Sequence, residues 1–161
     1  MINKPLVYLK EYDGLFRVNP KSDIFLRLVT YKSYEPDIAS ICLKYLDREK
    51  DAIDIGANMG FYTVLFAKNL GINKKVLSVE PSKNALEYLN ANIKENGVIE
   101  KVIIFEGAIS DHSGNSEIKV IRNKEEYSTL GPMIHPSVNK EMYEKEIIKT
   151  TILDDLIHNL K

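Results

Sequence analysis

The middle of the chain alternates between short apolar runs and longer segments that end near glycines. Apolar runs at residues 52–55, 75–80 and 101–106 predict three β-strands, because each is short and bounded by turn signals. Residues 61–70 and 82–96, which lie between these runs, predict two helices that end near glycines. This strand–helix–strand–helix–strand order with short turns indicates a parallel sheet whose two faces are covered by helices.

The first 32 residues are expected to form a small β region. Apolar runs at residues 5–12 and 16–18 flank the turn-like pair Asp13–Gly14. Residues 23–30 (DIFLRLVT) predict a further strand, because they are rich in apolar and β-branched side chains.

An amphipathic helix is expected next, with Pro36 in its first turn. Its predicted apolar face has the i, i+3, i+4, i+7, i+8 spacing and comprises Ile38, Ile41, Cys42, Tyr45 and Leu46. On that face Cys42 is interpreted as core filler rather than a nucleophile, because no partner base is evident.

The pattern changes after the third strand of the alternating region. A turn at residues 111–115 precedes a predicted strand at 116–123, and an irregular segment covers 125–140. Residues 147–152 predict a last strand that runs into a final helix.

Neither a repeat nor a linker interrupts the chain, so residues 1–161 are expected to form one domain. Within it, residues 1–32 would be the β region and residues 33–161 an incomplete Rossmann-like core. The chain carries 22 Lys and Arg against 23 Asp and Glu, a net charge of −1. This balance does not indicate a nucleic acid or an anionic membrane as the partner.

The single cysteine, Cys42, excludes an internal disulfide and a cysteine-built zinc site, and it favours a reducing compartment. The first residues, MINKPLVYLK, lack the apolar region of a secretory signal, and no apolar stretch approaches 18 residues. A soluble cytoplasmic protein is therefore expected.

Candidate chemistry lies at the corner DAIDIGANMG, where the first strand of the alternating region meets its helix. Gly56 permits a tight turn, and Gly60 lets the helix backbone approach a ligand or the sheet. Their G-x-x-x-G spacing departs from the dinucleotide fingerprint G-x-G-x-x-G. An adenosyl sulfonium carries no phosphate and suits such a looser turn, with Asp54 placed to orient the loop or to accept from an ammonium.

Glu80 ends the second strand and is placed to accept hydrogen bonds from both hydroxyls of a ribose. Pro81 follows it and would turn the chain over the edge of an adenine. A ribose-binding acid at this place occurs in proteins that bind NAD and in proteins that bind S-adenosylmethionine (SAM). The glycine spacing favours SAM.

Three stretches, DAIDIGANMGFYTVLFAKN, VLSVEPSKNALEYLNANIKENG and VIIFEGAISDHSGNSEIKV, resemble the FkbM-type SAM-dependent methyltransferases. SYEPDIA upstream and TTILDDL near the end extend the resemblance over residues 33–156. The resemblance implies a Rossmann-like methyltransferase fold, SAM as cofactor, and O-methylation of a sugar or small metabolite.

Carried over position by position, the resemblance also implies cofactor contacts. The implied positions, with Pro81 beside them, are Asp54, Gly56, Ala57, Asn58, Gly60, Glu80, Gly107 and Ala108. The last two belong to the segment from Glu106 to Ala108, which would lie near the adenine. Asp111 and Glu35 also match acids of the family, although Asp111 equally suits a turn.

Members of that family continue past the TLDDL segment into a further strand, whereas this sequence stops at Lys161. We therefore expect the strand at 52–55 to have an open apolar edge, which is an aggregation hazard unless it is covered. Another copy of the chain, or the segment at 147–152, is expected to cover it.

The sequence does not single out a catalytic base. His112, His135 and His158 each stand alone, and no acids join them at metal-ligand spacing. Tyr127, Met133 and Tyr143 suit packing more than an acceptor site.

Two alternatives to a methyltransferase stay open. One is a SAM- or nucleoside-binding module without turnover, which the early stop favours. The other is an NAD-dependent oxidoreductase, which the glycine spacing disfavours.

Overall fold

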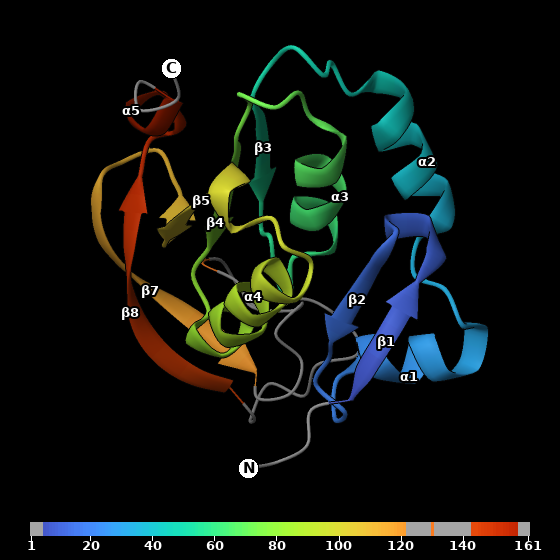
Figure 1. Cartoon of the computed structure of the whole chain (residues 1–161). Coiled ribbons are helices and arrows are strands. Elements are labelled where there is room, and N and C mark those ends of the chain that lie inside the picture. The colour runs from blue at the N-terminus through green and yellow to red at the C-terminus, as the bar shows by residue number, and fades with distance from the viewer. Residues whose placement is uncertain (1–4, 122–129, 131–142, 158–161) are drawn as a thin grey trace.

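A three-stranded parallel sheet stands at the centre of the computed structural model, which describes residues 5–121, 130 and 143–157 (Figure 1). Its order is β3-β4-β5, and Ile53 pairs with Leu77, which in turn pairs with Ile103. The strands are β3 (Ala52–Ile55), β4 (Val76–Glu80) and β5 (Val102–Glu106). The predicted parallel sheet with flanking helices is confirmed, and every strand boundary lies within one residue of its expected place.

Helices α3 (Phe61–Asn69) and α4 (Lys83–Glu95) pack against one face of this sheet. Both helices share one core cluster with the side chains of Val76 and Ala52. The expected apolar face of α4 is buried and comprises Ala85, Leu86, Leu89 and Ile93. Helices on both faces were expected, but in the part of the chain that the structure describes α3 and α4 lie on the same face.

The N-terminal region is a hairpin followed by a helix. Strands β1 (Leu6–Leu9) and β2 (Gly14–Arg17) pair antiparallel through the short 3-10 turn η1 (Lys10–Tyr12). A strand was expected at residues 23–30. This expectation is wrong, because these residues form helix α1 (Asp23–Tyr31). The Ser22 hydroxyl caps α1 by accepting from the amide of Phe25, and this cap outweighs the local β propensity.

Helix α2 (Pro36–Tyr45) forms where it was predicted, with Pro36 in its first turn. Its contact with the core is narrower than expected: Ala39 is buried, and Cys42 and Leu46 are half-buried. The rest of the predicted apolar face is exposed and comprises Ile38, Ile41 and Tyr45. Burial raises the pKa of the Cys42 thiol, which fits a packing role for this residue.

An aromatic cluster joins the hairpin to the first helix of the sheet. The Phe61 ring lies 4.8 Å from Phe16 and 5.5 Å from Tyr12, measured between ring centroids. Such pairs contribute about 0.5–1.5 kcal/mol each beyond the area that they bury. The hairpin therefore holds the start of α3 in place.

The C-terminal elements form a second sheet of order β6-β8-β7, which lies on the opposite side of the central sheet from β1 and β2 (Figure 1). A turn, η2, precedes β5, and α5 follows β8. The elements are η2 (Ile99–Lys101), β6 (Ala108–Ile109), β7 (Gly114–Ile121), β8 (Tyr143–Thr151) and α5 (Leu153–Ile157). The 147–152 segment was one of two candidates expected to cover the edge of β3. That expectation is wrong, because most of the segment belongs to β8, which pairs with β7 and β6. Within the described ranges β3 pairs with β4 alone.

Candidate cofactor pocket

The corner between β3 and α3 is a tight loop with three residues in the left-handed region. Gly56 and Gly60 have φ of 78° and 86°, and Asn58, a residue type that tolerates this region, has 48°. The amides of Gly56 and Ala57 both donate to the Val79 carbonyl, at 2.9 and 3.0 Å. The turn expected from Gly56 is therefore present, and hydrogen bonds tie it to the end of β4.

The two glycines serve different purposes. A Cβ on Gly56 would meet no protein atom within 4 Å, so this position borders open space. A Cβ on Gly60 would lie 2.6 Å from Cδ1 of Leu89. The close approach expected at Gly60 is thus with a side chain of α4, rather than with the sheet.

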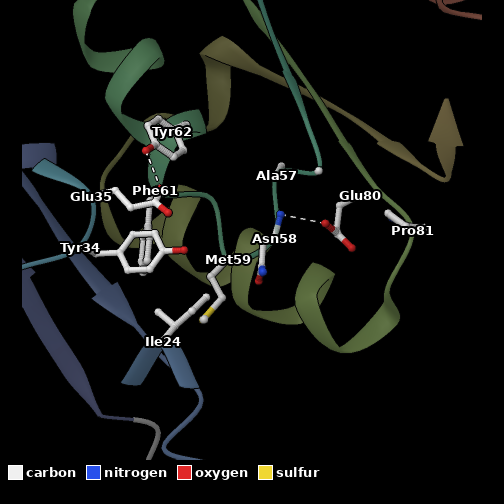
Figure 2. Close-up of a pocket in the computed structure, with 11 residues that line it drawn as sticks. Ile24, Tyr34, Glu35, Ala57, Asn58, Met59, Phe61, Tyr62, Glu80 and Pro81 are labelled. Carbon is white, nitrogen blue, oxygen red and sulfur yellow. Dashed lines mark hydrogen bonds between the residues drawn. The ribbon is translucent and has the colours of Figure 1, made fainter. Parts of the chain in front are cut away.

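A pocket of about 330 Å³ opens at this corner, a size within the usual range for small-molecule sites (Figure 2). It is lined by Ile24, Tyr34, Glu35, Gly56, Ala57, Asn58, Met59, Phe61, Tyr62, Glu80 and Pro81. Two carboxylates belong to this described lining, and none of its residues is a lysine or an arginine. The electrostatics of the pocket therefore suit a cation more than a phosphate.

Glu80 closes one end of the pocket and is 6% exposed. Its carboxylate accepts from the amides of Asn58 and Ser82, both at 2.8 Å. Each carboxylate oxygen has more than one acceptor site, so these bonds do not exhaust its capacity. Glu80 thus organises the corner loop and also lines the pocket, where Pro81 stands beside it (Figure 2).

Asn58 carries a polar atom that the protein leaves unsatisfied. Its Oδ1 is buried and has no hydrogen-bond partner among the described residues, although the side chain lines the pocket. A buried acceptor without a partner costs about 1–3 kcal/mol, which a ligand donor would offset. The orphaned oxygen and the open space at Gly56 both fit a bound ligand with a donor group.

Glu35 stands at the other end of the pocket, across Asn58 from Glu80 (Figure 2). Its carboxylate accepts from the Tyr62 hydroxyl at 2.9 Å. Burial, above all, raises the pKa of Tyr62, so this hydroxyl stays protonated and able to donate. The backbone of Glu35 has φ of 48°, an uncommon value for a residue that caps a helix. Strain of this kind is typical of binding sites.

Asp54, at the end of β3, is not one of the residues that line the pocket. It is 9% exposed and accepts from the Thr63 hydroxyl at 2.6 Å, which in turn lies 2.8 Å from the Ser78 hydroxyl. Burial raises the pKa of Asp54. This network links β3, β4 and α3, so it holds together the elements that the corner connects. A cofactor contact of Asp54 stays a prediction.

The other predicted positions are Gly60, Gly107 and Ala108. Gly107 donates its amide to the Glu80 carbonyl at 3.1 Å, and Ala108 begins β6. Neither residue lines the pocket, and neither does Gly60. Their expected contacts with a cofactor remain predictions.

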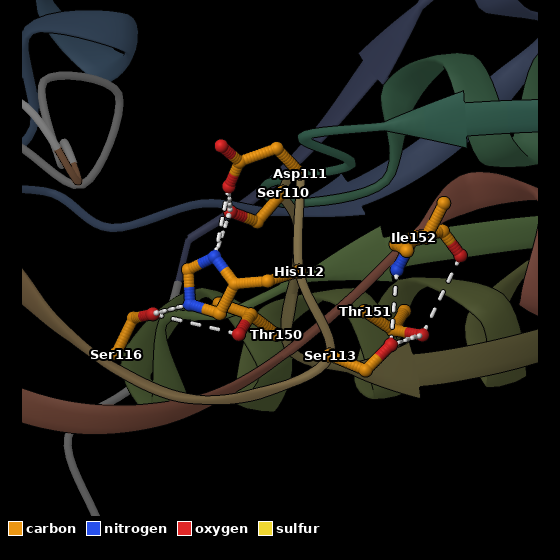
Figure 3. Close-up of polar contacts among 8 residues, drawn as sticks. All are labelled: Ser110, Asp111, His112, Ser113, Ser116, Thr150, Thr151 and Ile152. Atoms are coloured by element: carbon orange, nitrogen blue, oxygen red, sulfur yellow. Dashed lines mark hydrogen bonds and ion pairs between the residues drawn. The ribbon is translucent and has the colours of Figure 1, made fainter.

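His112 and Asp111 belong to a separate polar cluster at the start of β7 (Figure 3). The Nδ1 of His112 lies 2.8 Å from Oδ1 of Asp111, and this contact lowers the pKa of the carboxyl. Both side chains are mostly exposed, and Asp111 lies in a bend of the chain just before β7. His135, His158, Tyr127 and Met133 lie outside the described residues.

Sequence reasoning missed several residues of the pocket. Ile24 was missed because α1 was expected to be a strand, and Tyr34 because the 32–35 segment has no periodicity. Met59, Phe61 and Tyr62 are adjacent to the recognised corner, but apolar and aromatic types there are equally typical of packing. In the described ranges no group of three His, Cys, Asp or Glu side chains could hold a metal ion.

Residues 13–111, which include β2 through β6 and every lining residue of the pocket, match a family model of methyltransferases. The model is that of protein-L-isoaspartate(D-aspartate) O-methyltransferase (PCMT). This chain belongs to the PCMT family. The matched segment is more than half of the chain and contains the whole strand–helix alternation that forms the corner. In the described ranges no helix is long and apolar enough to cross a membrane.

Several solved structures are similar to this chain. The methyltransferase FkbM from Methylobacillus flagellatus is 12% identical, with a TM-score of 0.45, over 71% of this chain and 25% of that one. A protein-L-isoaspartate O-methyltransferase is 26% identical, with a TM-score of 0.42, over 47% and 24%. A structure described as that enzyme from Plasmodium falciparum, in complex with S-adenosyl-L-homocysteine, is 24% identical, with a TM-score of 0.40, over 46% and 39%.

The matched part therefore spans only about a quarter to two fifths of the length of these structures. No curated protein matches this sequence. The activity of this chain and the identity of its methyl acceptor are therefore proposed below.

Proposed function

We propose that this chain is a SAM-dependent methyltransferase that acts on an oxygen of a sugar or small metabolite. The charge of the pocket carries the proposal: two carboxylates and no lysine or arginine line its described part. SAM is a cation with an ammonium and a ribose, whereas NAD brings a pyrophosphate that such a lining would repel. Membership of the PCMT family supports the same reaction class.

The residues of the pocket divide between the two ends of the cofactor. Glu80 would accept from the ribose hydroxyls, with Pro81, Gly107 and Ala108 toward the adenine. Gly56, Ala57 and Asn58 would face the middle, with Gly60 and Asp54 holding the loop that presents them. Glu35 would accept from the ammonium while Tyr62 fixes its orientation. When bound, SAM supplies an electrophilic methyl group.

The FkbM-type resemblance is the finer part of this proposal. It rests on the corner IDIGANMGFYT and on the stretch VEPSKNALEYLNANI. It favours a sugar or small metabolite as acceptor over the aspartyl residues named for the PCMT family. The location proposed for such an enzyme is the cytoplasm.

Isothermal titration calorimetry of the whole chain with SAM, S-adenosylhomocysteine (SAH) and NAD tests the proposal. We expect SAM and SAH to bind and NAD to bind more weakly. Glu80→Ala should weaken SAH binding by about 1–3 kcal/mol, the usual loss when a buried hydrogen-bond acceptor is removed. Glu80→Gln keeps one acceptor oxygen and should lose less. Preferential binding of NAD, or unchanged affinity in Glu80→Ala, would contradict the assignment.

A binding module without turnover is the second candidate. One observation favours it: the described lining of the pocket includes no histidine to serve as a base. SAM binding without methyl transfer to any member of a panel of sugars and small metabolites would establish it.

We also propose that a second copy of the chain covers the outer edge of β3. Ile55 on this strand is 54% exposed, and β3 has one paired side within the described residues. An open strand edge templates pairing with another chain. Light scattering coupled to gel filtration should give the mass of a dimer, and a monomer at high concentration would contradict this proposal.

A further inference from the structure

A second cavity, of about 480 Å³, lies between α1 and the segment that leads into α2. It is lined by Leu26, Arg27, Thr30, Tyr31, Ser33, Tyr34 and Glu35. Tyr34 and Glu35 also line the cofactor pocket, so the two cavities meet at these side chains. The second cavity is thus placed beside the end of the cofactor pocket that is farther from Glu80 (Figure 2).

Hydrogen bonds hold the shared wall in place. The Glu11 carboxylate accepts from the Tyr34 amide at 2.6 Å and from the Ser33 hydroxyl at 2.9 Å. The Tyr12 hydroxyl donates to the Tyr34 carbonyl at 3.1 Å. A wall fixed in this way is preformed, which lowers the entropic cost of binding a ligand.

The second cavity differs from the first in its chemistry. It contains the guanidinium of Arg27, which has no hydrogen-bond or ion-pair partner in the described ranges. The Tyr31 ring is 74% exposed and offers an apolar face, and the hydroxyl of Thr30 lies one residue away. A guanidinium matches a carboxylate in a bidentate pair, and an aromatic face packs on the apolar side of a sugar ring.

We propose that this second cavity is the acceptor site, and that it takes a sugar acid whose carboxylate pairs with Arg27. The proposal rests on the proposed function, because it places the acceptor beside the cofactor pocket. The ring of the sugar packs on Tyr31, and its hydroxyls face Thr30 and Glu35. Nitrogen–proton NMR spectra of the whole chain test this site separately from SAH binding.

The probes are D-glucuronate and D-glucose, which differ in one carboxylate, added to protein saturated with SAH. We expect glucuronate to shift the amide signals of Arg27, Thr30 and Tyr31, and glucose to shift them less. Arg27→Gln and Tyr31→Ala should each weaken glucuronate binding by about tenfold, the size of a lost charged hydrogen bond or aromatic contact. Both side chains are exposed, so these variants should fold.

Matched controls lie on α2 and beyond it. Arg48→Gln removes an exposed guanidinium elsewhere, and Tyr45→Ala removes a ring that is 76% exposed. Both should bind glucuronate as the parent does, and all four variants should bind SAH unchanged. Glucuronate shifts that are absent, or that persist in Arg27→Gln, overturn the proposal, as do signals that move only with an isoaspartyl peptide. Failure of the parent to bind SAH counts instead against the proposed function.

Discussion

Replacing each glycine of the corner by alanine should separate the structural role of one from the ligand role of the other. Gly56 and Gly60 have nearly the same φ, 78° and 86°, so alanine pays a similar backbone cost at both. That cost is about 1–2 kcal/mol for the left-handed region, offset by about 0.4–1 kcal/mol from the stiffer unfolded chain. Gly56→Ala should therefore lose only about 1 kcal/mol of unfolding free energy.

Gly60→Ala should lose more, because its new methyl group would lie 2.6 Å from Cδ1 of the fully buried Leu89. Overpacking of this kind costs about 1–3 kcal/mol, so the total is about 2–4 kcal/mol. Urea unfolding followed by circular dichroism gives the unfolding free energy of both variants. These free energies can be compared if the m-value, which reflects the surface exposed on unfolding, is the same in both. In Gly60→Ala/Leu89→Ala the clash is relieved, so the double variant should be more stable than the two single losses predict.

SAH affinity should follow a different order from stability. Gly56 lines the pocket and borders open space, so its methyl group would occupy ligand volume. Gly56→Ala should therefore weaken SAH binding more than Gly60→Ala does. The reasoning is refuted if the two variants have unfolding free energies within about 0.5 kcal/mol of each other, the usual error of additivity.

Three further outcomes are expected. Burial raises the pKa of Asp54. The protonated carboxyl therefore stabilises the fold at low pH, and this contribution is lost as the pH rises above 3.8, the ordinary pKa of the group. In Asp54→Asn the Tm should decline less steeply as the pH rises. Tyr62→Phe removes the donor to Glu35 and should weaken SAH binding by about 1 kcal/mol in calorimetry, with little change in Tm. Asn92→Ala removes a wholly buried amide that donates to the Met59 carbonyl at 2.8 Å and should cost about 2–4 kcal/mol in urea unfolding; a loss below about 1 kcal/mol would contradict its bracing role.

The alternation of strands and helices over residues 52–106 could be predicted because the apolar runs are short and bounded by turn signals, and the longer segments between them end near glycines. The corner could be predicted for a local reason as well, since two glycines and an asparagine permit the left-handed backbone found there. Glu80 follows from the same order, because parallel strands bring their carboxyl ends to one edge. These features depend on neighbours within a few residues along the chain.

Other features depend on contacts between distant segments. The 23–31 segment has the composition of a strand, but Ile24 and Leu28 reach the core only as a helix. The pocket acquires Tyr34 and Glu35 because Glu11 and Tyr12 fix the segment that carries them, more than twenty residues away. The role of Gly60 likewise became visible only with Leu89 packed against it. The sequence by itself thus determined the alternation of strands and helices, the corner and its acid. Only tertiary packing decided which side chains close the pocket, because those contacts join segments that are distant along the chain.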